Sequence, residues 1–110
     1  MRTKTNGELR IENVGEVVTL TGWVSKKRDL GGVVFIDLRD RYGITQLIVN
    51  PDNKNYDKAV DVKNEYVLKV TGKVVERSSK NKNIPTGDIE LEVEELNNYF
   101  NIKGDKNYAY

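Results

Sequence analysis

An aromatic ring, an amide and a guanidinium lie close together in one part of the sequence, at Phe35, Gln46 and Arg28. Phe35 alternates with the apolar residues of its segment, and Gln46 does so in the next segment, so both are predicted to point away from the core. Such a ring can stack on a planar base, an amide can read the base edge, and a guanidinium can bind a base or a phosphate. The combination favours binding of an unpaired base.

Each of these three residues also has an ordinary structural explanation. Phe35 is buried if its segment is covered on both faces, Gln46 is an exposed strand residue, and Arg28 is a solvated turn cation. The charged residues Asp37 and Arg39 share the predicted face of Phe35, which argues against a second buried face. Taken singly, the residues leave both interpretations open.

The composition excludes most catalytic chemistry. The 110 residues contain no Cys and no His, so they cannot form a disulfide, a Cys/His zinc site, a thiol nucleophile or a Ser-His-Asp triad. The sequence also lacks an EF-hand pattern and a Gly-rich phosphate-binding motif. We therefore expect a binding protein without cofactor or metal, and not an enzyme.

The sequence has no feature of an exported or membrane protein. The start MRTKTNGELR contains no apolar signal-peptide stretch, and no run of about 18 apolar residues is long enough to span a bilayer. We therefore expect a cytoplasmic chain with no membrane partner.

Charge is balanced overall but unevenly distributed. The chain has 18 Lys plus Arg and 17 Asp plus Glu, which gives a net charge of +1. Residues 69–82, which include Arg77, are basic, whereas residues 88–95, which include Glu90, are acidic. The ordinary explanation is solvated loops and strand faces, with Glu90 on an edge strand that outward carboxylates protect from aggregation.

Five segments show the alternation of apolar and polar residues that is typical of half-buried strands. They cover residues 16–28, 33–40, 44–51, 65–77 and 87–96. Residues 52–64 have helical spacing and predict a short helix, while the turn formers of residues 78–87 predict an exposed loop. Gly22 is expected to mark a bulge or a tight bend in the first strand.

Five strands with one short helix between the third and fourth are the elements of the OB-fold, an all-β, five-stranded Greek-key barrel. Its second and third strands and its 1-2 and 4-5 loops bind oligonucleotides or oligosaccharides. Phe35, Gln46 and Arg28 lie on or beside these elements. We expect one domain over residues 1–97 and a tail without assigned structure over residues 98–110.

The longest motifs carry a family resemblance. The run GELRIENVGEVVTLTGWVSKKRDLGGVVFIDLRDRYGITQLI and the later IPTGDIE resemble the N-terminal anticodon-binding domain of bacterial aspartyl-tRNA synthetase. The resemblance is collinear from residue 1 to about residue 96. Lysyl- and asparaginyl-tRNA synthetases have related domains, but the spacing from RDLGG to FIDLRDR and the start MRT resemble the aspartyl branch best.

The resemblance implies roles for six residues. In that family the Phe of FIDLRD stacks on the middle uridine of the anticodon, and a third-strand Gln and the Arg before DLGG hydrogen-bond to that base. Those positions are Phe35, Gln46 and Arg28 here. Polar residues of the 4-5 loop and an acidic residue of the fifth strand are associated with the outer anticodon bases, at Arg77, Asn81 and Glu90.

Two departures from the family pattern matter. The sequence ends at Tyr110, whereas the family continues into a class II catalytic domain, so we expect tRNA binding without aminoacylation. Residues 25–27 replace a more Arg-rich run, which keeps the charge but loses bidentate geometry.

The expected partner is the anticodon stem-loop of tRNA-Asp, with tRNA-Asn left open, and the isolated domain is expected to be a monomer. One alternative is a free-standing OB module that binds single-stranded nucleic acid non-specifically. Another is a protein-interaction module that uses the aromatic tail.

Overall fold

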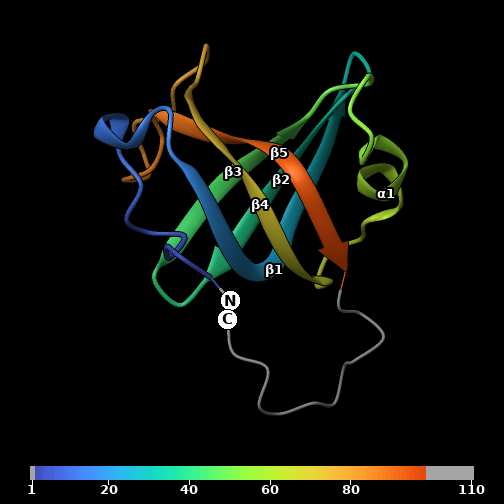
Figure 1. The fold of residues 1–110 in the computed structure, drawn as a ribbon, viewed down its shortest axis with the longest axis horizontal. Helices are drawn as coiled ribbons and strands as arrows, with labels where there is room; N and C mark the ends of the chain where they lie inside the picture. The colour runs from blue at the N-terminus through green and yellow to red at the C-terminus, as the bar shows by residue number, and fades with distance from the viewer. Residues whose placement is uncertain (1, 99–110) are drawn as a thin grey trace.

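The protein is a small barrel, which a computed structural model describes over residues 2–98. These residues form five strands and two short helices (Figure 1). Their bounds are η1 (Ile11–Asn13), β1 (Val17–Leu30), β2 (Val33–Asp40), β3 (Gly43–Val49), α1 (Tyr56–Asp61), β4 (Val67–Glu76) and β5 (Ile89–Asn98). The predicted all-β OB-fold barrel with one short α-helix between the third and fourth strands is confirmed.

The strands close into a barrel in the order β1-β2-β3-β5-β4. Neighbouring strands are antiparallel except β3 and β5, which pair in parallel. This pairing and that of β1 with β4 join the first three strands to the last two. Because β5 has a partner on each side, it is not the edge strand that the sequence suggested.

The interior of the barrel follows the period-two pattern of the sequence. On β2, for example, Val34, Ile36 and Leu38 are fully or almost fully buried, and the residues between them lie on the outer face. A β-bulge, at which Thr71 pairs with Glu95 but Gly72 with Val93, changes the phase of β5. Val93 and Leu96 are therefore both buried, although they are three positions apart.

The long strand β1 bends so that its first half pairs with β4 and its second half with β2. The register irregularity lies between Val24 and Lys26, and not at Gly22. Gly22 has a different function, because a Cβ there would lie 2.3 Å from the backbone oxygen of Arg39. The glycine permits the close approach of β1 and β2.

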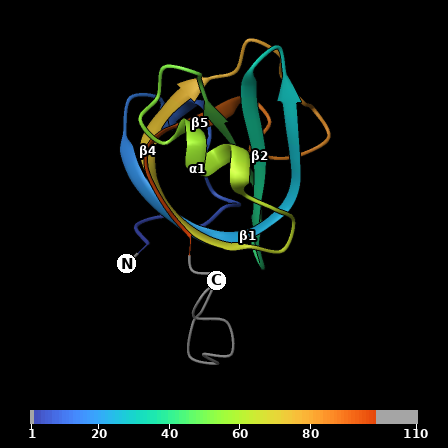
Figure 2. The same cartoon turned by 90° about the vertical axis from the view of Figure 1, so that its right-hand side faces the viewer.

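Helix α1 lies across one opening of the barrel (Figure 2). It covers 6 residues, fewer than the predicted helical segment 52–64, with Ala59 buried and Val60 41% exposed. Two asparagines before the helix attach it to β5: Asn53 Nδ2 donates to the oxygen of Val93 and Asn55 Nδ2 donates to that of Glu94. These bonds to the barrel wall hold a helix that is too short to be stable alone.

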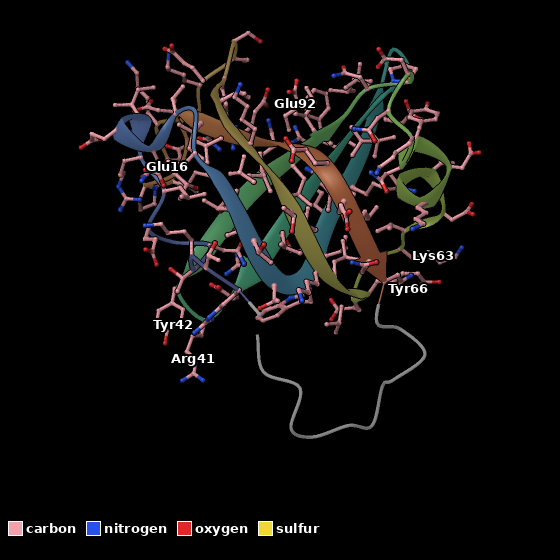
Figure 3. All side chains as sticks on the ribbon, in the orientation of Figure 1. Glu16, Arg41, Tyr42, Lys63, Tyr66 and Glu92 are labelled. Atoms are coloured by element: carbon pink, nitrogen blue, oxygen red, sulfur yellow. The ribbon has the colours of Figure 1, made fainter. Side chains whose placement is uncertain are left out.

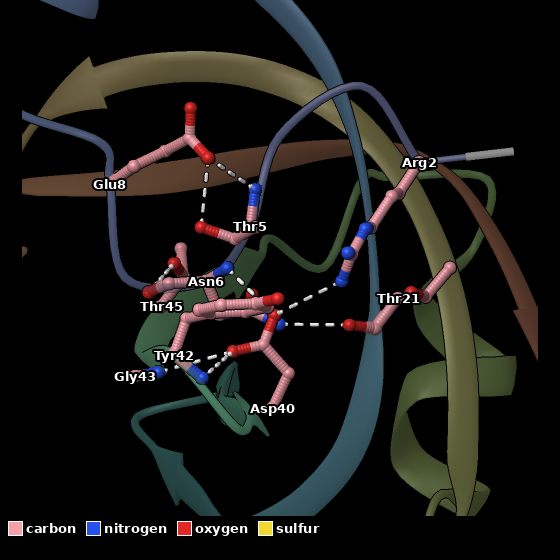
Figure 4. A network of polar contacts seen from close by, with 9 residues as sticks. All are labelled: Arg2, Thr5, Asn6, Glu8, Thr21, Asp40, Tyr42, Gly43 and Thr45. Atoms are coloured by element: carbon pink, nitrogen blue, oxygen red, sulfur yellow. Dashed lines mark hydrogen bonds and ion pairs between the residues drawn. The ribbon is translucent and has the colours of Figure 1, made fainter. Parts of the chain in front are cut away.

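The N-terminal segment is fixed to the barrel by a buried carboxylate (Figure 4). Asp40, 2% exposed, accepts hydrogen bonds from the backbone N–H groups of Asn6, Tyr42 and Gly43 at 2.8 to 3.1 Å. Arg2 Nη1 lies 3.9 Å from the same carboxylate. The sequence analysis did not single out this network, which joins residues 34 positions apart.

The described part of the chain ends with β5, one residue beyond the expected domain boundary at residue 97. The tail expected over residues 98–110 otherwise lies outside the described residues. Within residues 2–98, no helix is long and apolar enough to cross a membrane.

Candidate nucleic-acid interface

A cleft of about 400 Å³ lies between the outer faces of β1, β2 and β3 and the loop that joins β4 to β5. The strands that the sequence analysis selected form its floor, and the 4-5 loop forms a wall. Its lining residues are Lys26, Arg28, Leu30, Phe35, Asp37, Ile44, Gln46, Arg77, Ser79, Lys80, Asn81 and Ile84. Five of the six candidate residues therefore line one cleft.

Phe35 and Arg28 face each other across the β1–β2 ladder, where they are paired in register. The guanidinium carbon of Arg28 lies 5.7 Å from the centre of the Phe35 ring, which is a cation–π contact. The Arg28 guanidinium also lies 3.7 Å from the carboxylate of Asp37. Phe35 is partly buried on the outer face of β2, so its ring belongs to the cleft and not to the core.

Gln46 lies on the predicted outer face of β3 but is only 6% exposed. The sequence suggested an exposed strand residue, and the difference arises because its amide is covered by charged partners. Arg28 Nη2 donates to Gln46 Oε1 at 2.8 Å, and Gln46 Nε2 donates to Glu90 Oε1 at 2.7 Å. Both ends of the amide are therefore held by the protein.

Glu90 is buried, at 8% exposure, and does not contribute to the lining of the cleft. The interpretation as an outward carboxylate on an edge strand is wrong, because closure of the barrel places Glu90 beside Gln46. Burial raises the pKa of Glu90, while the hydrogen bond from Gln46 and the charge of Arg77 oppose that change. Glu92, two positions further along β5, points outward as expected (Figure 3).

Arg77 lies at the start of the 4-5 loop and is 7% exposed. Its Nε donates to the backbone oxygen of Ile89 at 2.9 Å. Burial lowers the pKa of Arg77, and the charge of Glu90 opposes this. The guanidinium is thus fixed in the wall of the cleft, whereas the side chain of Asn81 is exposed at its rim.

The 4-5 loop is less exposed than its composition suggested. Thr86 and Gly87 are buried, and the Thr86 hydroxyl donates to the backbone oxygen of Ile44 on β3. The backbone N–H of Asn81 donates to the oxygen of Gly87 at 3.0 Å and closes the loop on itself. Contacts with the barrel therefore shape the wall that carries Arg77 and Asn81.

Sequence reasoning missed several lining residues, notably Lys26, Ile44 and Ile84. Ile44 alternates with the core residues of β3, so the period-two pattern could have indicated it. Ile84 lies in the aperiodic loop and carried no comparable signal.

The cleft combines an aromatic and aliphatic surface with a fixed amide and an excess of cations. Among the charged residues that line the cleft, the only carboxylate is Asp37, and the cations include Arg28, Lys26 and Arg77. A further lining cation, Lys80, is paired with Glu76, which does not line the cleft. Among residues 2–98, no cluster of three or more potential metal-ligating side chains was found. The arrangement can stack a planar ring, bond to its edge and attract a phosphate.

The fold and this cleft define a class of small barrels that bind nucleic acid. The family described as "OB-fold nucleic acid binding domain" matches residues 18–99, and the chain belongs to this family. Within it, the resemblance to aspartyl-tRNA synthetases is confirmed. An aspartate–tRNA ligase from Parabacteroides distasonis is 58% identical over 98 residues, which is 87% of this chain and 17% of that ligase.

Solved structures show the same fold. An asparaginyl-tRNA synthetase from Pyrococcus horikoshii is 28% identical with a TM-score of 0.74, covering 87% of this chain and 22% of that one. The OBody AM2EP06, solved bound to hen egg-white lysozyme, has a TM-score of 0.78 at 20% identity, over 90% of this chain and 94% of the OBody. The latter likeness supports the fold alone.

The chain spans about a sixth of the length of the curated ligase it matches. The matched part is the anticodon-binding domain, and the rest of that ligase has no counterpart in these 110 residues.

Proposed function

We propose that this domain binds the anticodon loop of tRNA-Asp and reads the middle anticodon base in the cleft. The observation that carries the proposal is that a partly buried aromatic ring, Phe35, and the fixed amide of Gln46 line the same cleft and both contact Arg28. Stacking supplies affinity for any base, whereas the amide bonds to the base edge and supplies selectivity. The aspartate–tRNA ligase names of the relatives support tRNA-Asp as the partner.

In this proposal the residues of the cleft have different tasks. The Phe35 ring stacks on the middle uridine, and Gln46 and Arg28 hydrogen-bond to it. Arg77 and Asn81 in the wall bind an outer base or its phosphate. The sequence resemblance associates Glu90 with an outer base as well, but its side chain does not line the cleft, so in this proposal Glu90 acts through Gln46. The domain then supplies anticodon recognition to a ligase whose chemistry is carried by other parts of the whole protein.

Isolated binding is expected to be weak, because the cleft is small and a net charge of +1 gives little long-range attraction. We expect micromolar or weaker affinity, on the order of −8 kcal/mol or less in magnitude. We also expect a monomer, and a cytoplasmic location as for a domain of a synthetase.

The test is a titration of the chain with the anticodon stem-loop of tRNA-Asp at two salt concentrations. A matched stem-loop with another middle base, and that of tRNA-Asn, serve as competitors. A preference for the tRNA-Asp loop over the middle-base variant supports the proposal. Binding that depends on length and pyrimidine content alone would show a general single-strand binder instead.

A further inference from the structure

The amide of Gln46 is held in one orientation by its two neighbours. At one end Arg28 Nη2 lies 2.8 Å from Oε1, and at the other Glu90 Oε1 lies 2.7 Å from Nε2. A guanidinium can only donate hydrogen bonds, and an ionised carboxylate can only accept them. A rotation of the amide by half a turn would place donor against donor and acceptor against acceptor, so the two neighbours oppose it.

The fixed amide has bonding capacity left for a ligand. A primary amide has two N–H donors and an oxygen with two lone pairs, and one of each is used by Glu90 and Arg28. One N–H and one lone pair are therefore not used by these two partners, and the bonds to Arg28 and Glu90 set which end of the amide carries the donor and which the acceptor.

That order distinguishes two pyrimidines of the same shape. Uracil presents an acceptor, O4, beside the N3–H donor, whereas cytosine presents the N4 donor beside the N3 acceptor. For a base stacked in one position, an amide that complements uracil is opposed to cytosine at both atoms. An amide that is free to rotate could complement either base.

We propose that Glu90 is a positioning residue that makes Gln46 select uracil over cytosine. The inference rests on the proposed function and deepens it by adding a determinant that acts from outside the cleft. Glu90 is 8% exposed and is not a lining residue, so its route to the base runs through Gln46. Arg28 holds the other end of the amide, but it lines the cleft and is expected to touch the RNA itself.

The test uses two anticodon stem-loops that differ only by U or C at the middle position. They are titrated against the 110-residue chain and its variants Glu90→Gln and Glu90→Met. We expect the unmodified chain to prefer U by about 5- to 140-fold, the usual range for one bidentate base contact. Glu90→Gln retains an oxygen that can accept from Gln46, so its preference should stay within about threefold of that value.

Glu90→Met removes the acceptor but keeps the approximate length of the side chain. Its preference should fall to less than about threefold, and the C stem-loop should bind more tightly than it binds to the unmodified chain. Structural damage lowers affinity for both loops and cannot produce that gain. Glu92→Gln, an exposed carboxylate on the same strand, is the matched control and should leave the preference unchanged.

The outcomes separate the two proposals. An unmodified chain that binds neither loop, or both equally, refutes the proposed function and this inference with it. If the unmodified chain prefers U and Glu90→Met keeps that preference, the positioning role alone is refuted. The same holds if substitution of Glu90 changes the affinity only according to the identity of an outer anticodon base. If thermal unfolding shows that Glu90→Met does not fold, Glu90→Leu removes the same acceptor and decides between these results.

Discussion

Replacing Phe35 with Ala tests whether its ring belongs to the cleft or to the core. Loss of one stacked base contact costs about 1–3 kcal/mol of binding free energy. That corresponds to a weakening of roughly 5- to 140-fold in Kd. The stability cost should be smaller than the 3–5 kcal/mol of a fully buried Phe, because the ring lies on the outer face of β2.

The loss of stability expected for Phe35→Ala follows from the contacts of the ring. Phe35 is partly buried and has a cation–π contact with Arg28, which is worth about 0.5–1 kcal/mol at an exposed site. With the lost apolar contact included, we expect the free energy of unfolding to fall by about 1–2 kcal/mol. The domain should stay folded at room temperature, so binding can be measured on the native variant.

The neighbouring residue provides the matched control. Ile36 is fully buried on the opposite face of β2, so Ile36→Ala should cost about 2–5 kcal/mol of stability. The folded fraction of that variant should bind RNA almost normally. Urea unfolding gives the stability, and fluorescence anisotropy with a labelled anticodon stem-loop gives the Kd. If Phe35→Ala is as destabilising as Ile36→Ala and binds normally when folded, the assignment of the ring to the interface is refuted.

Four further predictions concern stability. Burial raises the pKa of Glu90 above its ordinary 4.5. The contribution of Glu90 to the free energy of unfolding should therefore be greatest below about pH 4.5 and be lost as the pH rises through the folded-state pKa. Urea unfolding of Glu90→Gln at several pH values should lack this decline. Glu8 should behave oppositely, because hydrogen bonds from Thr5 lower its pKa. Its contribution to the free energy of unfolding is present above about pH 4.5 and lost as the pH falls. If Glu8→Gln loses stability in acid as steeply as the unmodified chain, this prediction is wrong. Gly22→Ala should lower the free energy of unfolding by more than about 3 kcal/mol, because the new Cβ would lie 2.3 Å from the backbone oxygen of Arg39. Gly31→Ala is the control: its Cβ meets no atom within 4 Å, and the loss should be about 1–2 kcal/mol because of its φ of +61°. Asp40→Ala should lower the free energy of unfolding by about 3 kcal/mol or more, measured by thermal unfolding, because one buried and two partly buried N–H donors lose their acceptor. Asp40→Asn should fall between Asp40→Ala and the unmodified chain.

The strands and the barrel could be predicted because their signal is local. Alternation along β2 and β3 placed Val34, Ile36 and Leu47 inside, and the structure leaves all three with at most 1% exposure. The same alternation placed Phe35 and Gln46 on the outer face. Local pattern therefore identified the correct face of β2 and of β3, and five of the six residues implied by the family motifs line the cleft.

The burial of the candidate site could not be predicted in this way. Gln46 and Glu90 are 44 positions apart, and each looks like an ordinary solvated strand residue in its own segment. They become buried because β3 and β5 pair, and a parallel pairing of distant segments leaves no signature in either one. The same holds for Asp40 and Asn6, whose contact depends on where the N-terminal segment crosses the barrel.

The pairing of β3 with β5 also has a consequence for the order in which the chain folds. Its register comprises Leu47 with Leu91 and Ile48 with Glu92, which is far shorter than the antiparallel ladders of the other strands. Contacts between distant segments form late, because the loop between them must first be closed at a cost in entropy. The β1–β2–β3 meander can therefore assemble before β4 and β5 join it, and Gln46 meets Glu90 only when β5 pairs with β3. RNA that occupies the cleft would contact β3 and the 4-5 loop that leads into β5, so backbone amides of β3 and β5 should exchange their hydrogens more slowly when it is bound.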